Sequence, residues 1–369
     1  MKHKVCCIFN LAPHYRAPIY TLMDAELNCD FYFGDSLRNQ IKLMNFKTLT
    51  GFKKIVKNKK LTKSGFIWQS GTFFLLFKPY KYYIITGSPA ILSNWLLALV
   101  APILGKKVIA WTHGMKKPAT TRGELFQKFF YQLFQNILLY GNYSKNIMIQ
   151  EGFKEDKLIT IFNSLDYNNH IKLREKIGYT TIFKNYFKND KPVLIYIGRI
   201  QKSKKLDYLI IALKELIKNG IDCNAVLVGK QIDNGAIHNL INENNLSQNI
   251  WLYGPCYDET IIGELLFNSD VCVSPGPVGL TAIHALTFGC PVITNDDFPN
   301  QMPEHEAILT GETGDFFIND DINSLVMTIS NWINLTQFKK EGVRKKAYQI
   351  VEKNWNPNFQ IRRLKNLIK

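Results

Sequence analysis

The stretch VLIYIGRIQKSKKLDYLI, residues 193–210, indicates the fold class. A short apolar run ends at Gly198-Arg199, and apolar residues at helical spacing follow from Leu206. A continuously apolar strand that passes quickly into a helix is typical of parallel sheets, which helices cover on both faces. We therefore expect an α/β protein.

The same alternation of strand and helix patterns runs along the whole chain. Because ligands of parallel sheets bind at the carboxyl ends of the strands, the Gly and polar residues that end each run are candidates for function. The further runs are KVCCIFN (4–10), YYIITG (82–87), KVIAWTHG (107–114), NILLYG (136–141), NAVLVG (224–229), NIWLYG (249–254), DVCVSPG (270–276) and PVITN (291–295).

Length and charge indicate two domains with different partners. The 369 residues, 46% of them hydrophobic, can bury two cores. Residues 1–185 hold 27 Lys and Arg against 10 Asp and Glu, whereas residues 186–369 hold 19 against 20. The basic first half suits phosphates, nucleic acid or an anionic membrane, although a merely solvated lysine-rich surface would look the same.

Domain boundaries are expected where the pattern weakens. We predict an N-terminal Rossmann-like domain at 1–175, a Lys/Asn-rich linker at 176–192 and a second Rossmann-like domain at 193–350. Residues 351–369 are predicted to form a helix that crosses back to the first domain, after a bend that Asn356-Pro357 imposes.

The compartment is expected to be reducing and cytoplasmic. The seven cysteines are scattered without a Cys-x-x-Cys pair, which fits neither a disulfide framework nor a zinc site. The first residues do not resemble a secretory leader. The longest apolar stretch, 91–104, is too short to span a bilayer and predicts a buried helix.

The first functional signal is Gly198-Arg199-Ile200 followed by Lys204. Two cations at a strand-to-helix turn can meet one diphosphate. The pattern resembles the Gly-Arg-Leu-x-x-x-Lys-Gly signature of family 4 glycosyltransferases, which implies that Arg199 and Lys204 bind the diphosphate of a nucleotide-sugar. Lys205 stands where the family usually has glycine.

The second signal is the turn Gly276-Pro277-Val278-Gly279-Leu280-Thr281, which leads into a helical pattern. It places the amides of 279–281 at a helix N-terminus, where they can bind an anion. The resemblance implies donor contacts from Gly198, Gly276, Val278, Gly279, Leu280 and Thr281. Two departures are prominent: Gly276 and His284 stand where the family has glutamates that contact the transferred sugar and the ribose. His284 is still expected to bind the donor, through one hydrogen bond to the ribose.

Two glutamates downstream are candidates to replace this missing acidic function. Glu306 lies where the family has a glutamate ahead of its Gly-x-Thr-Gly turn, and Glu304 precedes it by two residues. We hypothesise that Glu304 or Glu306 contacts the donor sugar; a solvent-facing acidic loop is the alternative.

In the first half, His113 follows an apolar strand, and the resemblance implies that it lies at the reaction centre, where it positions substrate rather than acting as nucleophile. His14, Tyr15 and Arg16 follow the first strand and are predicted to bind the acceptor. Residues 163–166, Asn-Ser-Leu-Asp, are interpreted as a structural turn.

The segment GFKKIVKNKKLTK, residues 51–63, holds six lysines beside Phe52, Ile55, Val56 and Leu61. Such a mixture suits an anionic lipid surface. No stacking module or zinc finger pattern accompanies these cations, so nucleic acid is not expected.

Together, the resemblance implies the GT-B fold, two Rossmann-like domains whose parallel sheets face each other across a cleft. It implies a retaining glycosyltransferase that moves a sugar from a nucleotide-sugar to a lipid-linked or oligosaccharide acceptor at the inner face of a bacterial membrane, in capsule, O-antigen or other surface-polysaccharide assembly. No cofactor or metal is expected, because Asp296-Asp297 and Asp320-Asp321 are adjacent pairs rather than a spaced ligand set. A nucleotide-sugar epimerase and a catalytically silent sugar-nucleotide-binding partner remain open as alternatives.

Overall fold

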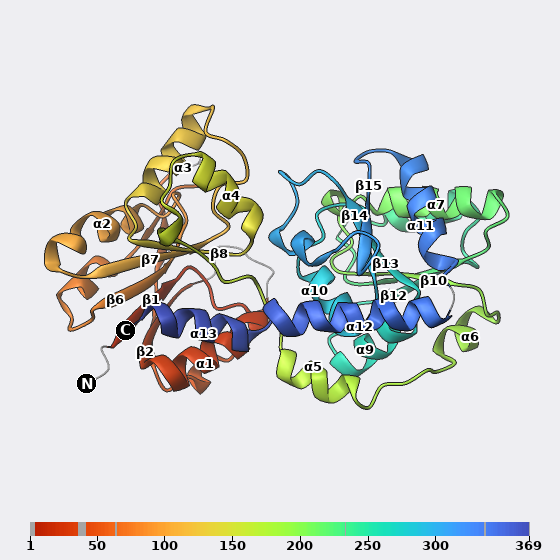
Figure 1. The fold of residues 1–369 in the computed structure, drawn as a ribbon, viewed down its shortest axis with the longest axis horizontal. Coiled ribbons are helices and arrows are strands. Elements are labelled where there is room, and N and C mark those ends of the chain that lie inside the picture. Colours follow the sequence, from red (N-terminus) through yellow and green to blue (C-terminus); the bar gives the residue numbers. More distant parts are fainter. Residues whose placement is uncertain (1–3, 36–41, 63–64, 233, 336, 369) are drawn as a thin grey trace. The chain divides into compact units, whose positions relative to one another are not determined.

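The computed structural model describes residues 4–35, 42–62, 65–232, 234–335 and 337–368. The chain divides into two compact units (Figure 1). Unit 1 comprises Met1–Asp166 and Asn356–Lys369, and unit 2 comprises Tyr167–Trp355. Each unit has its own parallel sheet with helices on both faces.

Unit 1 is built on a sheet of seven parallel strands in the order β3-β2-β1-β6-β7-β8-β9. The strands are β1 (Val5–Phe9), β2 (Cys29–Gly34), β3 (Phe52–Val56), β6 (Tyr82–Thr86), β7 (Lys107–Thr112), β8 (Asn136–Leu139) and β9 (Leu158–Thr160), and β4 (Asn58–Lys60) pairs with β5 (Ile67–Gln69) in a separate hairpin. The helices are α1 (Ala17–Leu27), α2 (Leu92–Val100), α3 (Arg122–Gln132), α4 (Asn142–Gln150) and α13 (Pro357–Leu367), with the 3-10 helices η1 (His14–Arg16), η2 (Phe46–Thr48), η3 (Phe73–Phe77), η4 (Pro102–Leu104) and η5 (Glu155–Lys157).

The strands of unit 1 are apolar on both sides because each side faces a helical layer. Cys6 and Ile8 of β1 join the core with α2, α3 and α4. Val5 and Cys7 join the opposite core with α1 and α13. This alternation explains why the strand sequences are continuously apolar rather than alternating with polar residues.

Unit 2 is built on six parallel strands in the order β12-β11-β10-β13-β14-β15. They are β10 (Val193–Ile197), β11 (Asn224–Val228), β12 (Ile250–Gly254), β13 (Val271–Ser274), β14 (Val292–Asn295) and β15 (Gly314–Phe317). The helices are α5 (Tyr167–Arg174), α6 (Ile182–Phe187), α7 (Leu206–Lys218), α8 (Ala236–Glu243), α9 (Glu259–Asn268), α10 (Leu280–Thr287), α11 (Ile322–Ile333) and α12 (Gln337–Asn354), with η6 (Lys202–Lys204) and η7 (Pro303–Ala307).

Residues 167–192 lie in unit 2, whereas the sequence predicted the first domain to reach 175 and a linker to follow. The reason is that α6 packs against unit 2. Its Phe183 and Phe187 are buried, and Tyr186 stacks on Trp251 with the ring centroids 4.1 Å apart. A short helix with two buried aromatics does not show the longer amphipathic period that would have revealed it.

The chain returns to unit 1 at Asn356. Helix α12 ends at Asn354, and α13 begins at Pro357, whose missing N–H is tolerated at a first helical position. In α13, Gln360 is buried and donates from Nε2 to the carbonyl oxygen of Phe162 at 2.9 Å, while Ser164 Oγ donates to Gln360 Oε1 at 2.7 Å. The 163–166 turn is thereby tied to the last helix.

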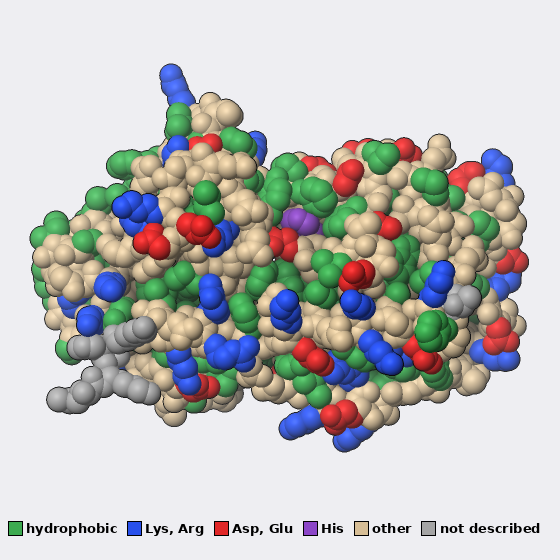
Figure 2. Space-filling model, viewed as in Figure 1, with side chains coloured by type: hydrophobic (Ala, Val, Ile, Leu, Met, Phe, Trp, Pro, Cys, Tyr) green, Lys and Arg blue, Asp and Glu red, His purple; other side chains and the backbone are tan. Residues whose placement is uncertain are grey.

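The apolar stretch 91–104 differs from the predicted buried helix. Helix α2 ends at Val100, and Leu99 and Ile103 are 50% and 82% exposed. No helix among the described residues is long and apolar enough to span a membrane. On the face that Figure 2 shows, Lys and Arg side chains occur over both units and alternate with Asp and Glu.

Candidate functional site

The two signals of the second half flank one point of the unit 2 sheet. The strand order reverses between the neighbours β10 and β13. The strands that follow β10 in sequence, β11 and β12, extend the sheet toward one edge, and those that follow β13, β14 and β15, extend it toward the other edge. Ligands of open α/β sheets bind at the carboxyl ends of the strands at such a point. Arg199 and Lys204 follow β10, and the turn 275–279 follows β13.

Arg199 and Lys204 lie close enough to influence each other. Arg199 is exposed and Lys204 is half-buried. Burial lowers the pKa of Lys204, the carboxylate of Glu304 raises it and the Arg199 cation lowers it. The Lys204 ammonium also donates to the carbonyl oxygen of Pro277. The two cations therefore form one positive site beside the turn after β13.

The N-terminus of α10 adds backbone donors. The first amides of a helix have no acceptor within the helix. Gly279 is the N-cap residue, in a positive-φ conformation (φ 58°) that favours glycine, and no side chain caps it. Val278 differs from its predicted role as a direct contact, because its N–H donates to Gln301 Oε1 at 3.0 Å. The Thr281 hydroxyl donates to Ile197 O at 2.8 Å and therefore does not cap the helix.

Position 276 has no room for a side chain. The Gly276 N–H donates to Lys204 O at 3.0 Å. A Cβ at Gly276 would lie 2.5 Å from Ser203 O and 2.8 Å from the Cα of Lys204. Gly276 therefore holds the Lys204 loop through its backbone, and a glutamate at this position would require the loop to move.

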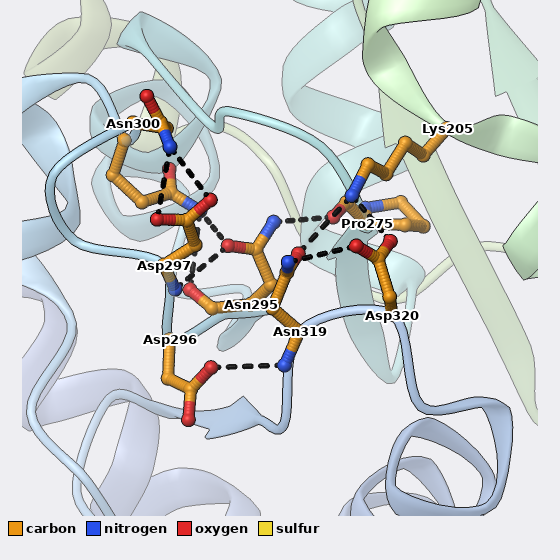
Figure 3. Close-up of polar contacts among 9 residues, drawn as sticks. Lys205, Pro275, Asn295, Asp296, Asp297, Asn300, Asn319 and Asp320 are labelled. Atoms are coloured by element: carbon orange, nitrogen blue, oxygen red, sulfur yellow. Dashed lines mark hydrogen bonds and ion pairs between the residues drawn. The ribbon is translucent and has the colours of Figure 1, made fainter.

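A buried polar network supports the turn after β13. Gln301 Nε2 donates to Thr294 Oγ1 at 3.0 Å and to Asn295 O at 3.1 Å. Asn295 Nδ2 donates to Pro275 O at 2.6 Å, as Figure 3 shows. Gln301, Thr294 and Asn295 were not predicted from the sequence. Thr294 and Asn295 are the last two residues of β14, and this strand-end position was the available signal.

The adjacent aspartates of the sequence form hydrogen bonds and an ion pair within the loops around this network (Figure 3). Asp296 accepts from the N–H of Asn319 at 2.9 Å, and Asp297 accepts from Asn300 Nδ2. Asp320 pairs with Lys205, which has the positive φ (49°) that explains why glycine is usual at position 205.

A cluster of two histidines and a glutamate joins α5, α9 and α10. His170 Nε2 and His284 Nε2 lie 3.0 and 2.8 Å from the same oxygen, Glu259 Oε2, and the imidazoles stack with centroids 5.2 Å apart. Burial raises the pKa of Glu259, but hydrogen bonds from both histidines outweigh it and hold that pKa well below its usual range. These three are the only His, Cys, Asp or Glu side chains, among the residues described, spaced to hold a metal ion.

The two glutamates of η7 differ in environment. Glu304 is 1% exposed and acts electrostatically on Lys204, whereas Glu306 is half-buried. The structure thus places one of the two hypothesised carboxylates, Glu304, beside the cationic site.

In unit 1, Arg16 lies at the carboxyl edge of the sheet, at the end of η1. Its guanidinium carbon lies 5.0 Å from the ring centroid of Trp111 and 4.9 Å from that of Tyr140, and it donates a hydrogen bond to Tyr140 Oη. Trp111 belongs to β7 and Tyr140 follows β8, so the loop after β1 meets the ends of two other strands.

His113 follows β7 and is held between anchored neighbours. Gly114 has no space for a side chain, because a Cβ there would lie 2.1 Å from Ser144 Oγ. His113 is exposed as a residue, but its ring packs on Tyr140 with centroids 4.8 Å apart. Burial of the imidazole, followed by the Lys116 and Arg16 cations, lowers the pKa of His113 to about 4, so it is neutral at pH 7.

The other predicted residues of this loop differ from Arg16. His14 is exposed, and its N–H donates to Lys42 O at 3.0 Å. Tyr15 is half-buried and packs edge-on against His14, with centroids 5.7 Å apart. The structure therefore groups Arg16 with His113 through Tyr140.

The topology of the two units is that of the GT-B class, and solved GT-B structures share it. Anabaena Alr3699/HepE in complex with UDP superposes with a TM-score of 0.72 over 99% of both chains, at 16% identity. A lipopolysaccharide outer core galactosyltransferase, WaaB, superposes with a TM-score of 0.68 over 99% of both chains, at 13% identity. The predicted fold class is confirmed.

Residues 179–350, which lie within unit 2, match the family Glycosyl transferases group 1. A protein of the cps region of Klebsiella pneumoniae is 25% identical over 57% of this chain and 56% of its own length. The alpha-D-kanosaminyltransferase of Streptomyces kanamyceticus is 26% identical over 34% of this chain and 31% of its own length. These alignments span about half or less of each relative.

Proposed function

We propose that this protein is a retaining glycosyltransferase that moves a sugar from a nucleotide-sugar to a saccharide acceptor in the assembly of a bacterial surface polysaccharide. One observation carries the proposal: Arg199 and Lys204 follow β10 and the N-terminus of α10 follows β13, the two strands between which the unit 2 sheet reverses its order. The match to the group 1 family covers these residues. Two cations beside helix amides suit a diphosphate leaving group.

The proposed reaction needs no metal or cofactor. The bond between the anomeric carbon and the diphosphate oxygen breaks while the acceptor oxygen bonds to that carbon on the same face. The acceptor proton passes to the departing diphosphate, whose added charge Arg199 and Lys204 stabilise. The neutral His113 donates or accepts a hydrogen bond at the sugar but supplies no charge at pH 7.

Two carboxylates take over the acidic function that Gly276 and His284 do not provide. Glu304 lies beside Lys204, where it contacts the transferred sugar. Glu259 bonds to His284 through Oε2 and is partly exposed, with 37% of its side-chain surface accessible. Its other oxygen suits the ribose hydroxyls, which are hydrogen-bond donors.

The acceptor is proposed to be lipid-linked, with the protein lying at the inner face of the cell membrane. Lys54, Lys57, Lys59 and Lys60 are exposed on β3, β4 and the link between them, and Ile55 and Leu61 are 40% and 51% exposed beside them. Other parts of the predicted segment differ: Val56 is buried, Phe52 packs against the core, and Lys53 pairs with Asp30. Lys63 lies outside the described residues.

The test is a thermal-shift screen of nucleotide-sugars, beginning with UDP-sugars because HepE binds UDP. We expect one nucleotide-sugar to stabilise the protein, and Arg199→Ala or Lys204→Ala to weaken its binding by roughly tenfold or more each. Lys202→Ala is the matched control, because Lys202 is an exposed cation on the same loop. Equal losses in all three variants, or no stabilising nucleotide, would contradict the proposal.

Product analysis separates the proposal from its two alternatives. A transferase releases nucleoside diphosphate only with acceptor and gives a product with the donor's anomeric configuration. An epimerase changes the sugar without acceptor. A silent binding partner binds the donor without turnover, and His113→Ala then changes nothing.

A further inference from the structure

Arg16 is a cation that has no counter-charge among the described residues. It is half-buried, and its contacts are the Tyr140 hydroxyl and the faces of Trp111 and Tyr140. Over the part of the chain that the structure describes, no carboxylate forms an ion pair with it, and the groups that act on it electrostatically are Tyr15, Tyr20 and Tyr140. Nearly all buried charges in proteins are paired, because an unpaired one loses hydration without compensation.

The guanidinium keeps unused hydrogen-bond donors. Arginine has five N–H groups in a planar fork, of which the hydrogen bond to Tyr140 Oη, within the described part of the chain, uses one. Stacking on two aromatic faces fixes the plane of this fork and leaves its edge for a ligand. A fixed guanidinium edge matches the paired oxygens of a phosphate or carboxylate.

A second observation points to a ligand at the same place. The Nε1 donor of Trp111 is buried and has no hydrogen-bond partner among the described residues. Buried indole N–H groups usually have a partner. Trp111 is the aromatic residue over which the Arg16 guanidinium stacks, so an unmet charge and an unmet donor occur in one cluster.

The location also fits a binding site. The order of the unit 1 sheet reverses between β1 and β6, and Arg16 lies on the segment that follows β1. Such a reversal creates a ligand crevice at the carboxyl ends of the strands. His113, at the end of β7, shares Tyr140 with Arg16.

We propose that Arg16, stacked between Trp111 and Tyr140, binds an oxyanion of the acceptor, either a phosphate or a sugar carboxylate, next to His113. This inference rests on the proposed function only in identifying the bound molecule as the acceptor. The oxyanion site itself is argued from residues of unit 1 alone. It makes the acceptor an anionic molecule and assigns its anchoring to Arg16 rather than to His14.

Oxyanion binding at Arg16 is expected to raise the pKa of His113. The Arg16 cation is one of the groups that lower the pKa of His113. The other charged and titratable groups that face this imidazole are Lys116, which also lowers that pKa, and the Tyr140 hydroxyl. An anion on Arg16 cancels part of this positive field, so the pKa of His113 rises when the site fills.

The experiment uses the full chain with Arg199→Ala and Lys204→Ala, which removes the anion site of unit 2. Isothermal titration with inorganic phosphate, hexyl phosphate, glucuronate and glucose measures binding. We expect at least one of the three anions to bind and glucose not to bind. Adding Arg16→Met weakens that binding roughly tenfold or more, whereas the control Arg122→Met, which removes an exposed arginine of the same unit, leaves it unchanged.

The anions also distinguish the source of the charge. Hexyl phosphate binding more tightly than inorganic phosphate assigns the site to a lipid-borne phosphate, and glucuronate binding most tightly assigns it to an acidic sugar. Anion binding that survives Arg16→Met, or no binding of any anion, overturns the proposal. Arg16→Lys is a second variant, which keeps the positive charge but loses the planar fork. Its anion affinity is expected to lie between that of the parent protein and that of Arg16→Met, which tests the fork even where Arg16→Met disturbs the packing.

A spectroscopic measurement reports on unit 1 independently of affinity. The imidazole resonance of His113, assigned with His113→Gln, is followed at about pH 5, where a higher pKa increases the protonated fraction. We expect the bound anion to increase that fraction and Arg16→Met to abolish the response; an unchanged resonance at saturation contradicts the proposal. If instead no nucleotide-sugar binds the wild-type protein, the proposed function fails while this result stands.

Discussion

In unit 2, neighbouring charges act in opposite directions on the pKa of Lys204, a half-buried lysine. Burial and Arg199 both lower the pKa of Lys204, and Glu304 opposes them. Glu304 is therefore coupled to Lys204 in addition to its proposed contact with the sugar.

Glu304→Gln is expected to lower kcat/KM by roughly ten- to a hundredfold, because a hydrogen bond to a charged group contributes about 1.5–3 kcal/mol. Since the carboxylate raises the pKa of Lys204, its removal lowers that pKa further. The alkaline limb of the pH profile of nucleotide binding therefore moves to lower pH. Glu306→Gln is the control on the same turn, and wild-type turnover in both variants would show that neither glutamate has an acidic role.

At the level of elements, the loops after β10 and β13 are fastened to each other through Gly276. The Gly276 N–H donates to Lys204 O, and the backbone of residues 203 and 204 fills the space that a side chain would need. The position of the cationic pair depends on this contact.

Gly276→Ala is expected to lower the free energy of unfolding of unit 2 by about 1–3 kcal/mol, because the new Cβ overlaps backbone atoms that cannot rotate away. Nucleotide binding weakens with it, since Lys204 moves. Gly342→Ala is the matched control on α12, where a Cβ meets nothing within 4 Å, and it is expected to stabilise by roughly 0.5–1 kcal/mol. Urea denaturation and nucleotide titration measure the two effects, and similar behaviour of both variants would refute the clash.

Helices α5, α9 and α10 are joined by a single carboxylate, Glu259, which two histidines contact. Because these hydrogen bonds hold the pKa of Glu259 below its unfolded value, its ionised form stabilises the fold. That contribution is complete above the unfolded pKa and is lost as the pH falls toward the folded pKa.

Glu259→Gln is expected to destabilise unit 2 by roughly 1 kcal/mol near neutral pH, a value reduced because the carboxylate is partly exposed. The difference from wild type should stay constant above about pH 5 and shrink below about pH 4. Glu264→Gln on the same helix is the control, because Glu264 has no ion pair among the described residues. A difference that grows on acidification would show that the carboxylate is not held in its ionised form.

For the whole molecule, the charge asymmetry of the sequence leads to a prediction about membranes. Lys57→Glu, Lys59→Glu and Lys60→Glu together should abolish flotation with anionic vesicles at low salt, since each cation contributes about 1 kcal/mol near such a surface. The control reverses three exposed lysines of unit 2, Lys188, Lys214 and Lys345. A wild-type protein that stays unbound at both low and high salt rules out the membrane proposal.

The sequence by itself determined the strands that lie in the nine predicted apolar runs, the GT-B class and the cationic pair. Each of the nine predicted runs contains a strand of the structure. These features could be predicted because apolar periodicity and strand-end motifs are properties of short segments. Four strands of the two sheets were missed. β9 and β15 are three and four residues long and carry little pattern, whereas β2 and β3 are six and five residues long, and the lysines of β3 were interpreted as a lipid-binding surface.

Only the tertiary structure decided which distant side chains meet. It brought Glu259 to His284 and His170, packed Arg16 between Trp111 and Tyr140, closed position 276 against Lys204 and returned α13 to unit 1. These contacts join segments separated by tens to hundreds of residues. Packing of whole helices and strands sets their geometry, and no local period of a sequence encodes it.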